Sequence, residues 1–355
     1  MRSFILAATV FCGAANADVP DVVTDILPVQ SLAAQVMDGL GTPDVLLRPG
    51  ASPHGYALRP TEARALQEAE LVFWVGPALT PWLTGPLETL SGEALHVALL
   101  DAAGTEVLQT REGPLFEAEH PHDDDAHADE VHAEDAPEEK SHDGHAHDDH
   151  AASEHAQDDT DHGHEHEAHG DDDHHAASGH THSGPDPHAW LDPSNARVWL
   201  AAIAQALGDA DPDNADTYRA NAQTAIEALE VQEQHIADRL SPLSKRSFTV
   251  YHDAFQYFEH RFGLTPLGAI AMNDASAPGP ARLTALRDRL TDAGVQCVFS
   301  EPQYNAGLIR AVSPEGAAHA VLDPLGAELP AGAGLYAGLL EALSTTIEEC
   351  LGRAR

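Results

Sequence analysis

The chain is poor in basic residues. Among its 355 residues, 18 are Lys or Arg and 58 are Asp or Glu, so the formal net charge at pH 7 is −40 with histidine neutral. Nucleic acid and anionic membrane surfaces repel such a chain, whereas cations are attracted to it. We therefore expect no nucleic-acid partner. The length and the 43% hydrophobic composition suffice for a substantial core, in two domains or in one domain with a disordered part.

Long apolar runs are also missing, apart from one at the N-terminus. Arg2 is followed by an apolar run over Phe4–Ala15, and an Ala-Asn-Ala motif then ends at Ala17. A basic residue, a short apolar run and an A-x-A site are typical of a secretory signal peptide. No run reaches the length of about 18 residues that a membrane span requires. The sequence therefore predicts cleavage after Ala17 and an exported protein without a membrane span.

Cysteine is scarce as well. Removal of the signal peptide would leave two cysteines, Cys297 and Cys350, and neither lies in a CxxC motif. An exported protein folds in an oxidising compartment, which favours a disulfide between them. Two buried free thiols are the alternative.

Histidine, by contrast, is abundant and unevenly distributed. Seventeen of the 24 histidines lie between His120 and His182, together with 21 acidic residues and one basic residue, Lys140. This stretch carries 20 of the 40 net negative charges. Because it has almost no large apolar side chains, it cannot offset the entropy of ordering, and residues 112–185 are predicted to be disordered.

This insertion is predicted to bind metal ions weakly. Closely spaced histidines chelate metal without a fixed fold, and acidic residues attract cations over longer distances. The accessory ligands that this composition indicates are His142, His145, His147, His150, His162, His164, His166 and His169. One hypothesis is an antenna that concentrates metal for a tighter site or senses its supply, and the alternative is a solvated linker without a physiological role.

Predicted strands and helices alternate on both sides of the insertion. The apolar strand at Leu71–Val75 is typical of a parallel sheet covered on both faces, and alternation restarts after the insertion with a strand at Phe248–Tyr251. Between them, apolar residues on one helical face predict a helix about 40 Å long. The expected fold class is α/β, with two α/β lobes that have parallel sheets and are joined by this long helix. The expected parts are the signal peptide at 1–17, an N-terminal lobe at 18–212 that contains the insertion, the connecting helix at 213–241 and a C-terminal lobe at 242–355.

Four residues outside the insertion lie where predicted strands give way to loops or helices: His54, His188, His252 and Asp323. Ligands of open α/β sheets bind beyond the carboxyl ends of the strands, and a cleft between two lobes could gather all four residues. Three imidazoles and one carboxylate suit tetrahedral Zn²⁺, and the set is too rich in nitrogen for calcium or magnesium. Each residue also has a purely structural interpretation. His54 would lie in a turn, His188 would cap a helix start, His252 would be a core histidine, and Asp323 would form an Asp-Pro turn.

Six motifs carry a resemblance to a known family. They are GASPHGYALRP at 50–60, VFWVGP at 72–77, DPHAWLDP at 186–193, YHDAFQYF at 251–258, SEPQ at 300–303 and LDPLG at 322–326. In this order the chain resembles the zinc-specific solute-binding proteins of ABC importers, the ZnuA type within the metal-receptor cluster. The resemblance implies two (β/α)4 lobes joined by a rigid helix, a metal held between the lobes, ligands at His54, His188 and His252, a disulfide between Cys297 and Cys350, and a His/acid-rich insertion.

Two positions bear on the choice of metal. Manganese receptors that resemble this chain usually have Glu at the position of His252, and imidazole in place of a hard carboxylate favours zinc. Some zinc receptors carry Glu immediately before the first ligand histidine, where this chain has Pro53. Asp323 is then the favoured fourth ligand, and a water molecule or Glu301 is the alternative.

The resemblance implies a periplasmic receptor that captures Zn²⁺, delivers it to an ABC permease and performs no chemistry, with a monomer as the default expectation. A manganese or other divalent-metal receptor of the same cluster is one alternative, and a periplasmic zinc buffer that acts through the insertion is another. A zinc hydrolase is a third, but the chain has no HExxH motif. Asp253 is its nearest candidate base, and its position next to His252 points the side chain elsewhere.

Overall fold

The computed structural model describes residues 19–111, 184–271, 279–304 and 306–353. The predicted signal peptide with its cleavage after Ala17 lies outside these residues. So do the eight accessory histidines and all but the last two residues of the predicted insertion.

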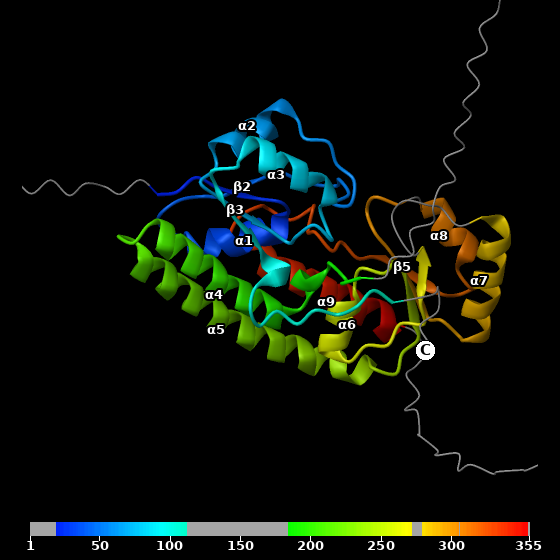
Figure 1. Ribbon diagram of the computed structural model, residues 1–355. Coiled ribbons are helices and arrows are strands. Elements are labelled where there is room, and N and C mark those ends of the chain that lie inside the picture. The colour runs from blue at the N-terminus through cyan, green and yellow to red at the C-terminus, as the bar shows by residue number, and fades with distance from the viewer. Residues whose placement is uncertain (1–18, 112–183, 272–278, 305, 354–355) are drawn as a thin grey trace, which may run out of the picture. The chain divides into compact units, whose positions relative to one another are not determined.

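The first half of the chain forms a parallel four-stranded sheet (Figure 1). Its strands are β1 (Val22–Thr24), β2 (Asp44–Val45), β3 (Leu71–Trp74) and β4 (Leu95–Ala98), in the order β2-β1-β3-β4. The helices between them are α1 (Leu27–Val36), α2 (Pro60–Glu68), the 3₁₀ helix η1 (Pro81–Leu83) and α3 (Thr84–Leu90), and the 3₁₀ helix η2 (Leu99–Asp101) follows β4. A helix therefore follows each strand, and a long loop joins β2 to α2.

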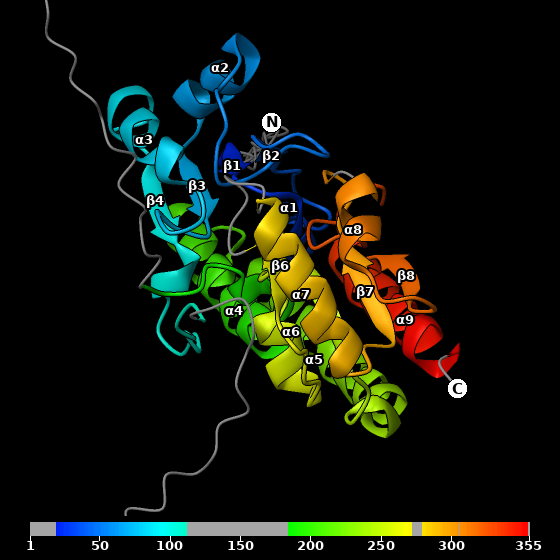
Figure 2. The same ribbon diagram turned by 90° about the vertical axis from the view of Figure 1, so that its right-hand side faces the viewer.

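The second half repeats this architecture. Its strands are β5 (Phe248–His252), β6 (Ala269–Ala271), β7 (Cys297–Ser300) and β8 (Ala318–Val321), all parallel and in the order β6-β5-β7-β8. Figure 2 labels β6, β7 and β8. Its helices are η4 (Ser241–Leu243), α6 (Gln256–Phe262), α7 (Pro280–Asp292), α8 (Ala306–Val312) and α9 (Leu335–Arg353). In both sheets the second strand lies at one edge and the first strand beside it. The two sheets confirm the predicted α/β class with parallel strands.

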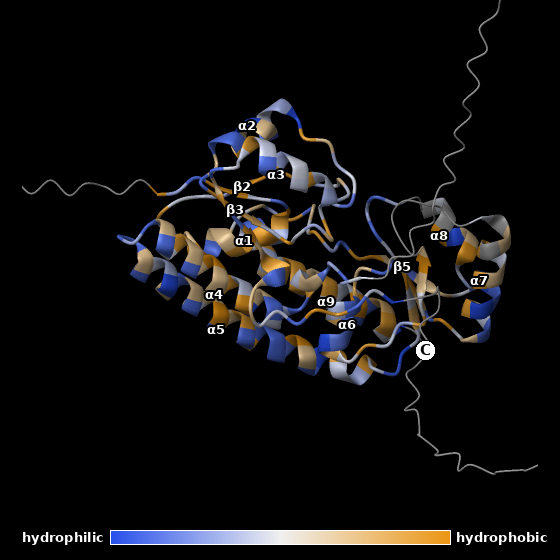
Figure 3. Ribbon diagram, viewed as in Figure 1, coloured by the Kyte–Doolittle hydropathy of each residue, from blue (hydrophilic) through white to orange (hydrophobic). Residues whose placement is uncertain are grey.

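Between η2 and η4 the described part of the chain contains η3 (Ala189–Leu191), α4 (Pro193–Ala210) and α5 (Ala215–Leu240). α4 begins where the Asp192 side chain accepts a hydrogen bond from the Ser194 N–H at 2.7 Å, a standard cap of a helix N-terminus. α4 and α5 lie side by side, and both carry hydrophobic and hydrophilic residues in turn along their length (Figures 1 and 3). α5 packs also against α1 and α9 and so contacts elements from both halves of the chain. A rigid connecting role for residues 213–241 remains a prediction.

The strands β1, β3 and β5 are buried at every residue, whereas the edge strands β4 and β8 are partly exposed. Along β3, Leu71 and Phe73 belong to the largest apolar cluster, whereas Val72 and Trp74 belong to a smaller cluster under α2 and α3. Successive side chains of a strand point to opposite faces, so a strand with a layer on each side has no polar face. The largest cluster extends from β1 to α9, so the two halves share one core.

Cys297 of β7 and Cys350 of α9 form a disulfide, with their Cα atoms 6.1 Å apart. The bond confirms the predicted pairing and ties the last helix to the second sheet. Among the described helices, none combines the length and apolar character that a membrane crossing requires.

Candidate metal centre

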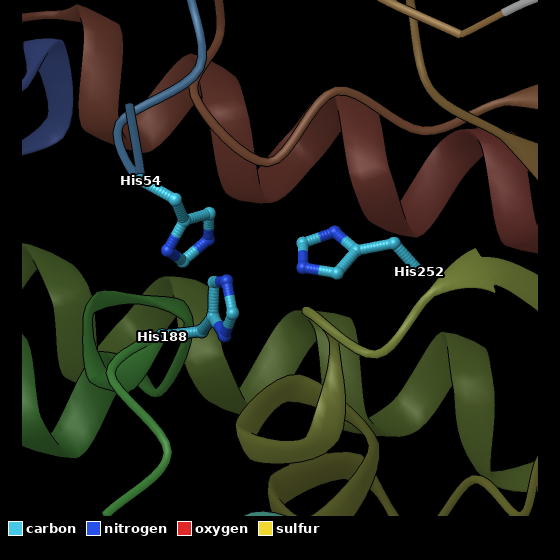
Figure 4. A group of neighbouring side chains, drawn as sticks. All are labelled: His54, His188 and His252. Atoms are coloured by element: carbon cyan, nitrogen blue, oxygen red, sulfur yellow. The ribbon is translucent and has the colours of Figure 1, made fainter. Parts of the chain in front are cut away.

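Three histidines from distant parts of the chain come together. Each of His54, His188 and His252 offers a ring nitrogen, and these nitrogens all lie within 4.8 Å of one another. The ring centroids are 5.5 Å apart for His54 and His188, 5.8 Å for His54 and His252, and 5.1 Å for His188 and His252. Figure 4 shows the three rings turned toward one another. Zinc binds imidazole nitrogen at about 2.0–2.1 Å, so small side-chain movements would suffice to place all three nitrogens on one ion.

His54 lies on the loop between β2 and α2. The Trp82 indole N–H donates to the Pro53 carbonyl at 2.7 Å, and the His54 backbone N–H donates to the Ser52 hydroxyl at 3.3 Å. At the end of the loop, Glu62 of α2 accepts a hydrogen bond from the Tyr56 hydroxyl at 2.9 Å. These bonds hold the loop to α2 and η1 of the first half. The His54 side chain is half-buried.

His188 is buried, and a neighbouring carboxylate orients it. Asp186 Oδ1 accepts from His188 Nδ1 at 2.7 Å and from the His188 backbone N–H at 3.0 Å. With Nδ1 engaged in this way, Nε2 is left to bind a metal, as in other carboxylate–histidine–metal arrangements. The Trp190 ring packs against the imidazole with centroids 5.3 Å apart.

A carboxylate also faces the Nδ1 atom of His252. His252 is the last residue of β5, one residue beyond the predicted end of this strand, and α6 begins only at Gln256. Its Nδ1 lies 3.1 Å from Oε1 and 3.4 Å from Oε2 of the buried Glu301, which follows the adjacent strand β7. The Gln303 amide also donates to Glu301, at 2.9 Å. Glu301 therefore orients the His252 ring and does not belong to the group of converging side chains.

Asp323, the predicted fourth ligand, is not in the group of converging side chains. Its Oδ1 accepts from the backbone N–H groups of Leu325 and Gly326, both at 3.0 Å, and its Oδ2 accepts from Ala327 N–H at 2.6 Å. These bonds form the Asp-Pro turn that was the structural alternative for this residue.

The four other histidines that the structure describes lie elsewhere. His96 bonds to the hydroxyl and the carbonyl of Ser91, at 3.1 and 2.9 Å. His235, His260 and His319 are exposed. Within the described residues, none of these four belongs to a metal-binding group.

An ion-pair cluster next to the centre was not predicted. Arg111 donates to Asp253, the neighbour of His252, and to Glu259 of α6 at 2.8 Å. Burial raises the pKa of Glu259 to about 7, although the charge of Arg111 opposes this rise. Because Arg111 holds Asp253, this carboxylate is not placed as a free general base. A single Arg before a low-complexity insertion carries no sequence signal of such a role.

Known proteins resemble this chain over nearly its whole length. The model of the ZnuA family, described as "Zinc-uptake complex component A periplasmic", matches residues 22–350. The chain belongs to the ZnuA family. A "High-affinity zinc uptake system protein ZnuA" from Paracoccus denitrificans (strain Pd 1222) is 44% identical over 99% of this chain and 98% of its own length. The protein of the same name from Yersinia pestis is 33% identical over 93% of this chain and 91% of its own length.

Solved structures of ZnuA share the fold. The "Crystal structure of ZnuA" has a TM-score of 0.67 and 22% identity, and covers 94% of this chain and 100% of its own. The "Crystal structure of 138-173 ZnuA deletion mutant plus zinc bound" has a TM-score of 0.66 and 21% identity, and covers 94% of this chain and 98% of its own. At this identity the likeness shows the fold alone.

Proposed function

We propose that this chain is a zinc receptor that binds Zn²⁺ with high affinity at His54, His188 and His252 and delivers it to the permease of an ABC importer. The convergence of three imidazoles carries the proposal. Nitrogen donors suit zinc better than calcium, magnesium or manganese, which prefer oxygen. Two buried carboxylates behind the imidazoles add negative charge, which further favours a cation. Binding and release require no chemical step, so the chain acts as a receptor and not as an enzyme.

The N-terminal sequence and the family indicate the cell compartment in which the receptor acts. The predicted signal peptide with cleavage after Ala17 and a family described as periplasmic support export to the periplasm. A receptor in that compartment can meet the outer face of a membrane permease. We expect it to act as a monomer.

The fourth zinc position is open to a water molecule or to Asp323. Three backbone N–H groups already occupy the Asp323 carboxylate, which favours water. Asp323→Asn distinguishes the two, because asparagine keeps one acceptor oxygen for the turn but loses the charge. With water as the fourth ligand, we expect the zinc affinity of the variant to equal that of the parent, while its free energy of unfolding falls by about 1–2 kcal/mol. A large loss of zinc affinity without a further loss of stability would identify Asp323 as a ligand.

The main experiment is a zinc titration of the metal-stripped mature protein that lacks residues 120–182, in competition with a strong chelator. Manganese is titrated in parallel. The receptor predicts one tight site that prefers zinc to manganese. His252→Ala should abolish this site, and His235→Ala, which changes an exposed histidine of α5, should leave it intact.

The same titration tests the alternatives. Loss of tight binding with residues 120–182 would indicate a zinc buffer that acts through the insertion. A preference for manganese would indicate a receptor for another divalent metal. In either case the assignment of zinc to the three histidines would have to be abandoned.

A further inference from the structure

The two segments that flank residues 112–183 form a short antiparallel pair, which we call the root pair (residues 108–110 and 184–186). Gln109 and Pro185 form an isolated antiparallel bridge. On one side of the bridge, Thr110 N–H donates to Gly184 O at 2.9 Å, and on the other side Asp186 N–H donates to Leu108 O at 2.8 Å.

A tyrosine hydroxyl is inserted into this pair. In a regular antiparallel ladder, Leu108 and Asp186 would exchange two direct N–H···O bonds. Here Leu108 N–H donates to the Tyr257 hydroxyl at 2.9 Å, and this hydroxyl donates to Asp186 O at 2.8 Å. A hydroxyl can donate and accept at the same time, so Tyr257 completes the second bond of the pair. Tyr257 is 1% exposed, so solvent does not compete for these bonds.

Tyr257 connects the chain segment that carries His188 with the helix that follows His252. Asp186, which accepts from the hydroxyl through its carbonyl, orients His188 through its side chain. Tyr257 belongs to α6, which begins four residues after His252. One hydroxyl therefore fixes the segment of His188 against the helix that follows His252.

Other contacts run between the same two segments. Arg261 of α6 donates to both carboxylate oxygens of Asp192, at 2.8 and 2.7 Å, just beyond His188. The loop of His54 is held differently, since Trp82 and Glu62 bind it to elements of the first half. The segments of His188 and His252 are thus anchored to each other, whereas His54 is anchored separately.

We propose that Tyr257 is a positioning residue for zinc binding, which holds His188 and His252 as a preassembled pair to which His54 is added. The proposal rests on the proposed function. Its consequence is that Tyr257 affects zinc affinity without contact with the ion, because a looser root pair lets Asp186 and His188 move away from the geometry that binds zinc.

Tyr257→Phe in the full mature protein tests this role, because it removes only the hydroxyl. The matched control is Tyr218→Phe, since the Tyr218 hydroxyl is also buried and donates to Asp211 at 2.9 Å, where α5 packs on the end of α4. Three quantities are measured for each variant: zinc affinity in competition with a strong chelator, the visible absorption spectrum of bound Co²⁺, and unfolding of the metal-free protein in urea.

We expect Tyr257→Phe to weaken zinc binding about tenfold, the lower end of the effect of residues behind metal ligands, and to alter the Co²⁺ spectrum. Tyr218→Phe should lose similar stability but keep the affinity and the spectrum of the wild type. Zinc affinity of Tyr257→Phe within about twofold of the wild type, or an equal loss in Tyr218→Phe, would overturn the positioning role alone. A wild-type protein without a tight zinc site would overturn the proposed function, and the positioning role with it.

Discussion

At the scale of single residues, two buried carboxylates stand directly behind the ligand imidazoles. Asp186 accepts from His188 and Glu301 accepts from His252, in each case through Nδ1. Each carboxylate selects the tautomer that leaves Nε2 for the metal and limits rotation of the ring. Because both are almost fully buried, their negative charge acts on the site with little screening by water.

Asp186→Ala should therefore weaken zinc binding. The change removes the acceptor that orients His188, and we expect a loss of about 10–100-fold in affinity, measured by chelator competition. Asp211→Ala is the control, because Asp211 is also a buried carboxylate but bonds to Tyr218 and Asn214, away from the histidines. Equal affinity losses in the two variants would show that general destabilisation, and not orientation of His188, is responsible.

The sequence pointed to three ligands but could not define the role of a fourth residue. The motifs around His54, His188 and His252 predict ligands, and the structure places their nitrogens together. An aspartate before proline suits a metal site and a turn equally well, so the motif around Asp323 cannot separate these roles. Only the positions of the three N–H groups that follow it favour the turn.

At the scale of helices and strands, hydrophobic patterning predicted the order of elements well. Continuous apolar runs predicted β3 and β5 because strands covered on both faces have no polar side. The end of β5 was placed one residue early, because His252 is polar although it still pairs in the sheet with Ala271. The root pair was not predicted, since a bridge between residues 109 and 185 depends on contacts across a long insertion and leaves no local periodicity.

The connection between β1 and α1 contains a carboxylate that makes stability depend on pH. Asp25 is fully buried and accepts from the N–H groups of Ile26 at 2.8 Å and of Val75, after β3, at 2.9 Å. Burial raises its pKa from 3.8 to about 7, although these hydrogen bonds oppose the rise. The folded protein then binds a proton that the unfolded chain has released, so stability is highest below the unfolded value and falls as pH rises toward 7.

Asp25→Asn should reduce this dependence. One proton of linkage corresponds to about 1.4 kcal/mol per pH unit, so between about pH 5 and pH 6.5 the decline of the unfolding free energy should become shallower by up to that amount. The measurement is urea unfolding of the metal-free protein across this range. Asp213→Asn changes an exposed carboxylate and should keep the wild-type slope. An unchanged slope in Asp25→Asn would show that Asp25 is ionised in the folded protein throughout the range.

At the scale of the whole molecule, zinc should stabilise the folded chain because its ligands come from three distant segments. His54, His188 and His252 converge only after both halves have folded, so the unfolded chain cannot form this site. One ligand-binding site contributes about 2.7 kcal/mol at a free ligand concentration of 100 times the dissociation constant.

Zinc at that concentration should raise the melting temperature of the protein lacking residues 120–182 by roughly 5 °C or more. This form is preferred because the many histidines of the insertion would also bind zinc in the unfolded state and reduce the effect. Differential scanning calorimetry with and without zinc measures the shift. His54→Ala should lose most of it, and a full shift in that variant would mean that zinc stabilises the protein from another site.

The root pair also has a practical consequence for protein engineering. Because Thr110 and Gly184 are hydrogen-bonded neighbours, a polypeptide joined after Thr110 and before Gly184 would connect two residues whose Cα atoms lie about 5.5 Å apart. A circularly permuted fluorescent protein, whose own ends adjoin, could therefore be spliced in at this position without stretching the host. Asp186 and His188 follow within a few residues, so the spliced protein would lie close to the metal centre. The same backbone pairing would then place an optical reporter beside the proposed zinc site.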